Sequence, residues 1–595
     1  MKKVSAIFLF VSFLLFYSCA GADGGGSSGD SGNGASSVSL TKSVAWDTSE
    51  NDTFVVEENV KSVTITGNLS GKKIYCATVN TSGTAINGEN YTKIAIDSTG
   101  DRSLVGADVT ALLPTFDSFS SDNYICHSEL NFTPPNISVS SSARTIDNPA
   151  SSNSKVTQLT DTVGSTKTLY VSLEDDSAGN PVKKEATLRA CNETCNVWVL
   201  DDYYDETSAG TKVNTDFAKK IAEKFKSLYP LVRNVYGNES DKIYYPVVRG
   251  NTIYFELFEM DYLSDTGTKV NIVIYDLYGD ADQGKVLGFF APRDYYPNDD
   301  DLHKLVDTSD NLNSYSNEGK YFYIDSYFLN NKYDDTISTL AHEFQHMIHY
   351  SVKKMSKGKD SDTNFNEMFS MLCEDMMQEF LGLEDKDSPK ARLQSFVTSY
   401  TLTGIREYNS ESPSTTTQSY ANAYAFGAWL CRQYGGAALV KEMMENDYTN
   451  NECIVAAVNK LNNGNYTFDD LFAQFVKACF GKDSTYTFNK DAASSLSYSG
   501  YNYPMKAINL WKKNSLYDMS SSVTEKRCFD PEYSELGPIV YQTGTYLKSF
   551  PAEYGTLLTR VKSFSNDFSD SSYTLNFVTK SGVTKPGMKL FLYIK

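Results

Sequence analysis

His342, Glu343 and His346 are the residues whose types and spacing most directly indicate chemistry, because they form the pattern H-E-x-x-H. Residues four apart lie on one face of an α-helix, so the two imidazoles could bind one zinc ion. Glu343 would lie beside that ion and could take a proton from an attacking water molecule. The alternative, incidental histidines on a surface helix, is disfavoured because the chain has only five histidines among 595 residues.

The stretch around this pattern has the features of a helix. Asp334 or Asp335 offers an N-cap, and no Pro or Gly follows before Gly358. Apolar residues recur at helical spacing at Ile337, Leu340, Phe344, Met347 and Ile348. The sequence therefore predicts one helix that presents both histidines on the same face.

A zinc site needs a third protein ligand, and two layouts are known for this pattern. In one, a third histidine follows as H-E-x-x-H-x-x-G-x-x-H. That layout is excluded because His349 stands at the Gly position and Val352 at the third histidine position. His349 lies roughly 10 Å along the helix from His342. We therefore interpret His349 as a hydrogen-bonding or substrate-side residue and not as a ligand.

The second layout takes a glutamate from another helix. Apolar residues at helical spacing predict such a helix from about Asn364 to a stop at Gly382, and a lysine-rich turn lets it fold back on the first. Glu367 is the predicted third ligand. Glu374 and Asp375 lie about two turns further on and are predicted to hold the second nitrogen of a histidine. Solvated helix charges are the alternative, more for Asp375 than for Glu367.

These residues resemble the gluzincin clan of zinc metallopeptidases. Within that clan, residues 339–350 and the lead-in 316–325 are similar to the hyicolysin family of bacterial secreted metallopeptidases. The resemblance covers roughly residues 165–480. It implies an α+β, zincin-type (thermolysin-like) fold, one Zn²⁺ per chain, and protein or peptide substrates. Related sequences usually read Asn-Glu-Gly at the second helix, and Met368 replaces that Gly here.

The resemblance also implies a residue that stabilises the oxyanion of the reaction intermediate. Residues 419–427 are similar to the aminopeptidase segment that carries such a tyrosine, which favours Tyr420, with Tyr424 next and a structural role as the alternative. The aminopeptidases also have a Gly-Ala-Met-Glu-Asn segment upstream of the zinc helix. No such segment precedes His342, which favours an endopeptidase over an aminopeptidase.

The first residues of the chain have the pattern of a targeting segment. Residues 1–19 combine a basic start with an apolar run too short to span a membrane stably, which predicts a signal peptide. Cys19 lies where a bacterial lipoprotein is cleaved and lipidated, with plain secretion as the alternative. Residues 20–37 form a flexible Ser/Gly linker. We therefore predict an extracytoplasmic protein, either anchored to a membrane through a lipid at Cys19 or secreted.

The remaining chain divides into a catalytic domain with β modules on both sides. Alternating strand patterns predict a β-sandwich-like domain over 38–137, and a small C-terminal β domain over 495–595. Between them lie a linker, 138–157, and the metallopeptidase domain, 158–494. The β modules could contact glycans or a cell surface, or only space the domains. His127 is interpreted as a structural histidine.

Three smaller features carry expectations about the catalytic domain. Cys191 and Cys195 flank a short turn, which favours a disulfide over a zinc pair. Cys373 is expected to be a buried free thiol. The strand over 320–324 is expected to be the sheet edge that binds extended substrate.

Two acidic clusters make Ca²⁺ a second candidate cofactor, because hard cations prefer oxygen ligands. The clusters are Asp276, Asp280 and Asp282, and Asp299, Asp300 and Asp301. Neither has the spacing of a calcium loop, so solvated acidic loops are favoured.

The composition limits the classes of partner. A net charge of −20 and a pI near 4.8 argue against nucleic acid, which requires a basic surface. The favoured function is a zinc-dependent endopeptidase. The alternative from another class is a surface adhesin or glycan-binding lipoprotein on a degenerate peptidase scaffold.

Overall fold

The structure is a computed structural model, and it describes most of the chain after residue 36. The described residues are 37–87, 93–95, 137–138, 162–173, 181–249, 252–260, 269–281, 286–298, 315–480, 485–486, 496–510, 538–542, 547, 549–578 and 583–595. The predicted signal peptide with Cys19, nearly all of both predicted linkers, and His127 lie outside these residues.

A six-stranded sheet forms the frame of the peptidase part, with the strand order β15-β16-β14-β11-β10-β9. The three middle strands, β11, β14 and β16, run parallel, and every residue in them is buried. Burial on both faces explains why these strands are mostly apolar or aromatic instead of alternating. The bounds are β9 Thr166–Val171, β10 Val182–Cys191, β11 Cys195–Leu200, β14 Val270–Tyr275, β15 Gly288–Phe290 and β16 Lys320–Asp325.

The edge of this sheet differs from the prediction. We expected residues 320–324 to be the edge strand, but β16 is bonded on both sides, to β14 and to β15. The edge is β15, which runs antiparallel to β16. A strand of three residues is too short to show a reliable pattern in the sequence, so it was not recognised.

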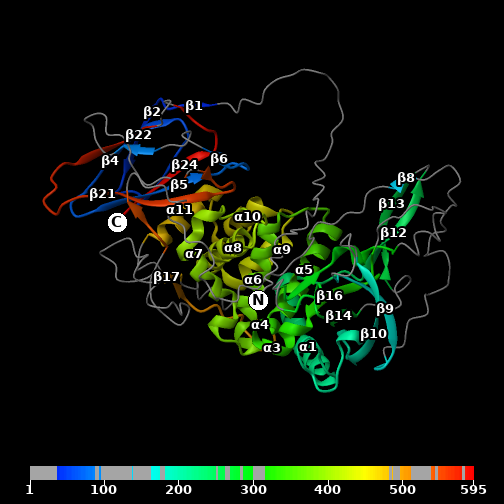
Figure 1. The fold of residues 1–595 in the computed structure, drawn as a ribbon. Helices are drawn as coiled ribbons and strands as arrows, with labels where there is room; N and C mark the ends of the chain where they lie inside the picture. Colours follow the sequence, from blue (N-terminus) through cyan, green and yellow to red (C-terminus); the bar gives the residue numbers. More distant parts are fainter. Residues whose placement is uncertain are drawn as a thin grey trace, which may run out of the picture. The chain divides into compact units, whose positions relative to one another are not determined.

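Two helices, α1 (Thr215–Tyr236) and α5 (Thr339–His349), pack on one face of the sheet (Figure 1). The Asn214 side chain caps α1 by accepting a hydrogen bond from Phe217 N. The helix contains Pro230 and continues for about two turns around and beyond it. Val232 and Val235 are buried, so packing of the last turns offsets the backbone bond lost at the proline.

The predicted disulfide between Cys191 and Cys195 is not formed. Cys195 is a free, buried thiol, with Sγ 3.6 Å from Asn192 Oδ1. Cys191 pairs across the hairpin with Asn196, so it is one residue out of register with Cys195. Side chains one step out of register point to opposite faces of a sheet. The two thiols accordingly pack in different cores, Cys195 on the α1 side and Cys191 on the other.

The rest of the peptidase part is helical. Helices α6 and α8 pack against one another, and α5 packs on α6 (Figure 1). A separate β12–β13 hairpin, extended by β8, contacts the main sheet through stacking of Tyr244 on Tyr296. The bounds are α3 Ser326–Asn331, α4 Tyr333–Ile337, α6 Thr363–Leu381, α7 Leu393–Ser399, α8 Pro413–Tyr434, α9 Gly436–Glu445, α10 Asn450–Asn462, α11 Phe468–Cys479, β8 Ile137–Ser138, β12 Lys242–Arg249 and β13 Thr252–Glu259.

The two predicted β domains are one sandwich, which corrects the separate domains expected at 38–137 and 495–595. One sheet has the order β19-β21-β5-β24-β3 and the other β2-β4-β22-β7, so each sheet contains strands from both ends of the chain. The bounds are β2 Lys42–Asp47, β3 Thr53–Val56, β4 Val60–Thr66, β5 Lys73–Asn80, β7 Lys93–Ala95, β19 Tyr541–Gln542, β21 Gly555–Ser563, β22 Ser572–Val578 and β24 Met588–Ile594. Short pairs complete the strands: β1 Val38–Ser39 with β23 Val583–Thr584, β6 Ile86–Asn87 with β20 Ser549–Phe550, and β17 Thr485–Tyr486 with β18 Ile508–Asn509.

The central strand of this sandwich, β5, is buried on both faces. Ile74 and Cys76 belong to the core between the two sheets, whereas Tyr75, Ala77 and Val79 pack in the core of the peptidase helices. Tyr75 stacks on Phe480, just after α11, with 5.0 Å between ring centroids. The sandwich is therefore part of the same packed body as the peptidase helices.

The boundary predicted at 494/495 also lies too early. Residues beyond it pack into the peptidase part: the Tyr501 hydroxyl donates to Met376 O, and the Tyr503 hydroxyl donates to Leu231 O at 3.0 Å.

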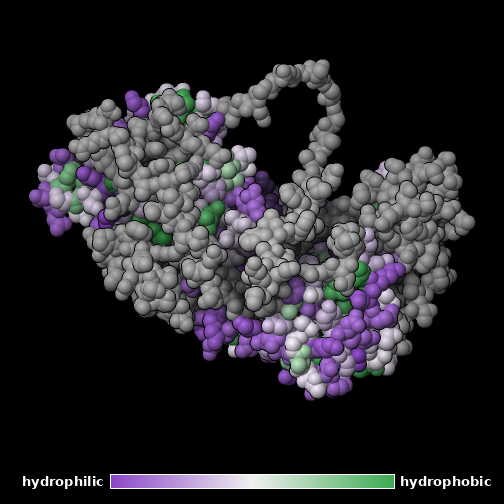
Figure 2. Space-filling model, in the orientation of Figure 1, coloured by the Kyte–Doolittle hydropathy of each residue, from purple (hydrophilic) through white to green (hydrophobic). Residues whose placement is uncertain are grey.

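The described surface agrees with the acidic, polar composition. Figure 2 shows a mostly hydrophilic face over α1 and the neighbouring strands β9 and β10. Charged side chains of α1, among them Lys219, Lys220 and Glu223, are exposed there. Among the described residues, no helix combines the length and the apolar composition of a membrane span.

Candidate metal centre

Helix α5 carries the H-E-x-x-H residues, but it begins later than predicted. Its N-cap position is Ser338, whereas Asp334 and Asp335 lie in the first turn of the preceding short helix, α4. All eleven residues of α5 are buried, because it lies between the sheet and α6. A π-helical turn, Tyr350–Ser356, follows directly.

Helix α6 begins after an N-cap residue and ends at a glycine. Asp362 caps the N-terminus by accepting from Phe365 N at 2.6 Å, and Gly382 ends the helix in the left-handed conformation, φ +77°. Glu367, Ser370 and Glu374 occur at spacings of three and four residues, so they share one face of the helix. Their contacts with the histidines show that this face meets α5.

His342, His346 and Glu367 come together as a buried group whose candidate ligand atoms lie within 4.8 Å of one another. Glu367 Oε2 is 3.2 Å from His342 Nε2 and 3.5 Å from His346 Nε2. Tetrahedral zinc with bonds of about 2.0–2.1 Å holds its ligand atoms about 3.3 Å apart. Two imidazole nitrogens and one carboxylate oxygen at these separations fit a zinc ion with one position left open.

The electrostatics of His346 and Glu367 match ligand chemistry, which needs neutral imidazole and ionised carboxylate. Burial lowers the pKa of His346, against the opposite effect of Glu367. Burial alone would raise the pKa of Glu367, but the two neighbouring histidines lower it to about 2.

Side chains of α6 form hydrogen bonds with both histidines. Glu374 Oε1 lies 2.8 Å from His342 Nδ1, so the carboxylate can accept the proton of that nitrogen and leave Nε2 for a metal. Ser370 Oγ lies 3.0 Å from His346 Nδ1 and 3.2 Å from His346 Nε2, and it donates to Gln345 Oε1 at 2.6 Å. Ser370 was missed in the sequence, although its position three residues after Glu367 places it on the same helix face.

Asp375 does not have the partner that we expected. Its carboxylate faces α8 and contacts Arg432, Tyr424 and Lys390, with no histidine among its bonded partners in the described chain. Consecutive helix residues point about 100° apart. If Glu374 faces α5, Asp375 must face elsewhere. Burial alone would raise the pKa of Asp375, and the charges of Arg432 and Lys390 hold it below its ordinary value.

Glu343 lies next to the edge strand of the sheet. A Cβ added to Gly288 of β15 would be 3.3 Å from Glu343 Cγ and 2.6 Å from Thr339 Cγ2. Only glycine fits there, so the backbone of β15 runs directly beside the candidate general base.

The other predicted site residues are placed as follows. His349 is buried and pairs its Nε2 with Ser361 Oγ at 2.9 Å, in agreement with a hydrogen-bonding residue. Tyr420 is buried on α8 and contacts the Arg392 guanidinium, 4.8 Å from its ring centroid, and Tyr408. Tyr424 donates its hydroxyl to Asp375 Oδ2. Cys373 is a buried free thiol, as expected.

The described residues contain one group of this metal-binding kind, the His342, His346 and Glu367 set. Asp276 and Asp280 do not form a second such group within the described chain. Asp276 instead accepts from Ala281 N at 3.0 Å, as a turn residue does. Asp282 and the cluster at 299–301 lie outside the described residues.

The structure has an H-E-x-x-H helix beside a sheet with an antiparallel edge strand, and a second helix that brings a glutamate to the histidines. These are the features expected from the resemblance to the gluzincin clan. The model of the peptidase M30 family matches residues 176–511, which is more than half of the chain, and the chain belongs to this family. The resemblance to the hyicolysin family is thereby confirmed.

One relative is the neutral metalloprotease ShpI of Staphylococcus hyicus. It is 26% identical over 314 residues, which cover 50% of this chain and 59% of ShpI. The chain therefore matches less than two thirds of the length of this relative.

Proposed function

We propose that this protein is a zinc-dependent endopeptidase that acts outside the cytoplasm. The observation that carries the proposal is the buried group of His342, His346 and Glu367, in which the carboxylate oxygen lies 3.2 Å and 3.5 Å from the two imidazole nitrogens, separations that suit a tetrahedral zinc site. The complete set of ligands with a carboxylate beside it also favours an enzyme over an adhesin on a degenerate scaffold.

Zinc bound there supplies a Lewis acid that activates water and polarises a peptide carbonyl. The protein supplies the proton transfers: the Glu343 carboxylate takes a proton from the attacking water and delivers it to the leaving amine. Glu374 keeps the Nδ1 proton of His342 in place, so that Nε2 stays available as a ligand. Tyr420 is proposed as the oxyanion donor.

The edge strand β15 is proposed to bind the substrate. Its outer side ends the main sheet, so an extended peptide can add to it as a further strand. Gly288 brings this backbone against Glu343, which would place a scissile bond beside the general base. Binding through backbone bonds needs no free substrate terminus, which supports an endopeptidase over an aminopeptidase.

The proposed location outside the cytoplasm is based on the N-terminal sequence. A signal peptide over residues 1–19 and lipidation of Cys19 would tether the enzyme to a membrane through the Ser/Gly linker, and secretion is the alternative. We further propose that the β-sandwich supports the peptidase helices, because β5 is part of their core.

The test is digestion of casein by the purified chain without residues 1–20, with metal analysis, with and without a zinc chelator. We expect about one zinc per chain and cleavage that the chelator abolishes. Glu343→Gln should retain zinc and lose cleavage by a factor of about 10³ or more. An N-terminally blocked peptide should be cut as well as a free one. Absence of both zinc and cleavage would contradict the proposal, and cleavage only of free N-termini would indicate an aminopeptidase.

A further inference from the structure

Helix α6 presents two rows of residues on different faces. Two members of the second row directly follow members of the first in the sequence. The first, Glu367, Ser370 and Glu374, meets the histidines of α5. The second contains Met368, Leu372 and Asp375 and meets α8: Met368 and Leu372 lie against Gly427, and Asp375 bonds to Tyr424 and Arg432. Glu367 and Glu374 are thus each followed directly by a residue that α8 holds.

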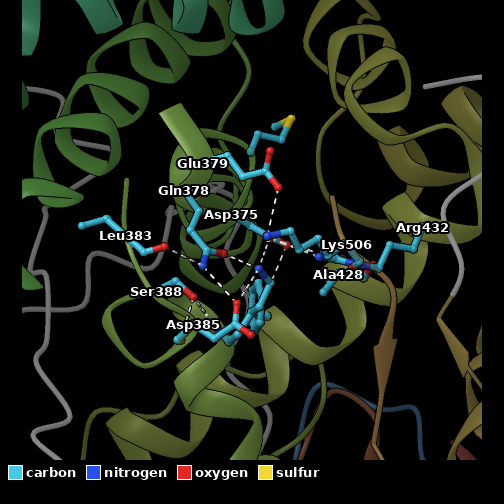
Figure 3. A network of polar contacts seen from close by, with 12 residues as sticks. Asp375, Gln378, Glu379, Leu383, Asp385, Ser388, Ala428, Arg432 and Lys506 are labelled. Carbon is cyan, nitrogen blue, oxygen red and sulfur yellow. Dashed lines mark hydrogen bonds and ion pairs between the residues drawn. The ribbon is translucent and has the colours of Figure 1, made fainter. Parts of the chain in front are cut away.

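Asp375 is the polar member of the second row and is held from several directions. Arg432 Nη1 lies 2.8 Å from Asp375 Oδ2 and Arg432 Nη2 donates to Oδ1 at 3.1 Å. The Tyr424 hydroxyl donates to Oδ2 at 2.9 Å, and Lys390 Nζ lies 3.6 Å from Oδ1. Figure 3 shows this network between α6 and α8.

Arg432 is itself fixed in place. Its Nε donates to Lys506 O at 2.7 Å and its Nη1 to Ala428 O at 3.2 Å, and the whole side chain is buried. Neither member of the pair can rotate into water. Removing one partner would leave a buried, uncompensated charge, so a small rotation of α6 that separates the pair is strongly opposed.

We propose that Arg432 and Asp375 are positioning residues of the metal centre, which set the rotation of α6 about its axis and thereby aim Glu367 and Glu374 at the histidines. A turn of α6 by about 20° moves side-chain atoms some 6 Å from the axis by about 2 Å, which is comparable with a zinc–ligand bond. Asp375 points about 100° away from Glu374 around the axis of α6. This inference rests on the proposed zinc site.

The test compares metal binding by four purified full-length variants with that of the wild type. Arg432→Met removes the cation, Arg432→Lys restores a charge without the fork geometry, and Tyr424→Phe removes one bond to Asp375. The control, Lys320→Met, removes another buried cation, which pairs with Asp241 at 2.6 Å and Glu239 at 3.5 Å. Zinc dissociation constants come from competition with a coloured chelator, and ligand geometry comes from the visible spectrum of the Co²⁺ form.

We expect Arg432→Met to weaken zinc binding about 10-fold or more and to alter the Co²⁺ spectrum. Arg432→Lys should recover part of the loss, and Tyr424→Phe should show a smaller change of the same kind. Lys320→Met should lower the melting temperature but change neither the zinc affinity nor the Co²⁺ spectrum. If Arg432→Met does not fold, Tyr424→Phe is the deciding variant. A zinc affinity and a Co²⁺ spectrum equal to those of the wild type in Tyr424→Phe would overturn the inference.

The outcomes separate the two proposals. A wild type that binds zinc and digests casein, with Arg432 and Tyr424 variants that bind zinc equally well, would overturn the positioning role alone. A wild type that binds no zinc would overturn the proposed function and the positioning role with it.

Discussion

Met368 of α6 lies directly against Gly427 of α8, where a Cβ on Gly427 would approach Met368 Cγ to 2.5 Å and Sδ to 3.1 Å. Met368 is buried, and it stands where the resemblance to the gluzincin families leads us to expect Gly. The large side chain on α6 is therefore accommodated by the absence of one on α8. The replacement enlarges the contact between these helices and leaves the metal-facing row of α6 unchanged.

This contact predicts strong coupling between the two positions. Gly427→Ala should destabilise the protein by about 1–3 kcal/mol, because it overpacks a filled interface. Met368→Ala alone should cost about 2–5 kcal/mol through the cavity it leaves. The double variant should cost less than the sum of the single changes, since each relieves the other. Denaturant unfolding of the four proteins measures this, and strictly additive losses would contradict the packing described here.

Glu374 and Ser370 are expected to contribute unequally to zinc binding. Glu374→Gln replaces the charged partner of His342 by a neutral acceptor and should weaken zinc binding about 10-fold. Ser370→Ala removes a neutral partner of His346 and should have a smaller effect. Ser326→Ala is the matched control, because Ser326 is also buried and its hydroxyl donates to Thr211 O at 2.6 Å. Equal affinities in all four proteins would show that α6 does not orient the histidines.

Asp294 predicts a pH dependence of stability away from the metal. Burial raises its pKa to about 6, against the opposing charge of Arg293 and a hydrogen bond from Tyr323. The folded state then binds this proton more tightly than the unfolded state, whose pKa is near 3.8. The contribution of Asp294 to stability is therefore fully present below pH 4, falls as the pH rises towards 6, and stays constant above that.

Asp294→Asn should remove this contribution to the pH dependence of stability. We measure the melting temperatures of wild type and variant from pH 4 to pH 7. Over this range the free energy of unfolding of the variant, relative to that of the wild type, should rise by about 3 kcal/mol. The Asn amide also loses one acceptor, so the variant should be the less stable protein at pH 4. A difference that stays flat across this range would show that Asp294 remains ionised in the folded state.

The metal centre was predictable from sequence to the extent that it depends on helical periodicity. The spacing of His342 and His346, and of Glu367 on a second helix, describes local geometry that one turn of helix already determines. The same periodicity separates Glu374 from Asp375, since seven residues return to nearly the same face and eight do not. The partners of Asp375 were not predictable, because Arg432 lies 57 residues further along the chain.

The β regions were predictable as strands but not as a domain. Strands β3, β4 and β5 lie within 38–137, where the sequence predicts a strand-rich domain. Nothing in a local pattern shows that β5 pairs with β21 and β24, which lie near the other end of the chain. Pairing between distant strands depends on the whole packed core, so the two halves of one sandwich were interpreted as two domains.

The docking of this sandwich predicts the effect of one small substitution. A Cβ on Gly404 would lie 1.9 Å from Ala552 O and 2.3 Å from Glu553 O, and backbone atoms cannot move aside as a flexible side chain can. Gly404→Ala should therefore separate this loop from the sandwich and break the bonds of Ile405 N to Tyr554 O and of Arg406 N to Glu553 O.

We expect Gly404→Ala to lower the melting temperature, to speed hydrogen exchange at the amides of Ile405 and Arg406, and to expose the sandwich to added trypsin. Zinc affinity should also fall, because Asn364 of α6, three residues before Glu367, bonds to Ile405 O and to the Arg406 guanidinium. Gly83→Ala is the control at the same contact, since its Cβ would meet only the flexible end of Glu553 at 3.3 Å. If Gly404→Ala behaves like Gly83→Ala, the sandwich is not held through this loop, and the shared core around Tyr75 must hold it alone.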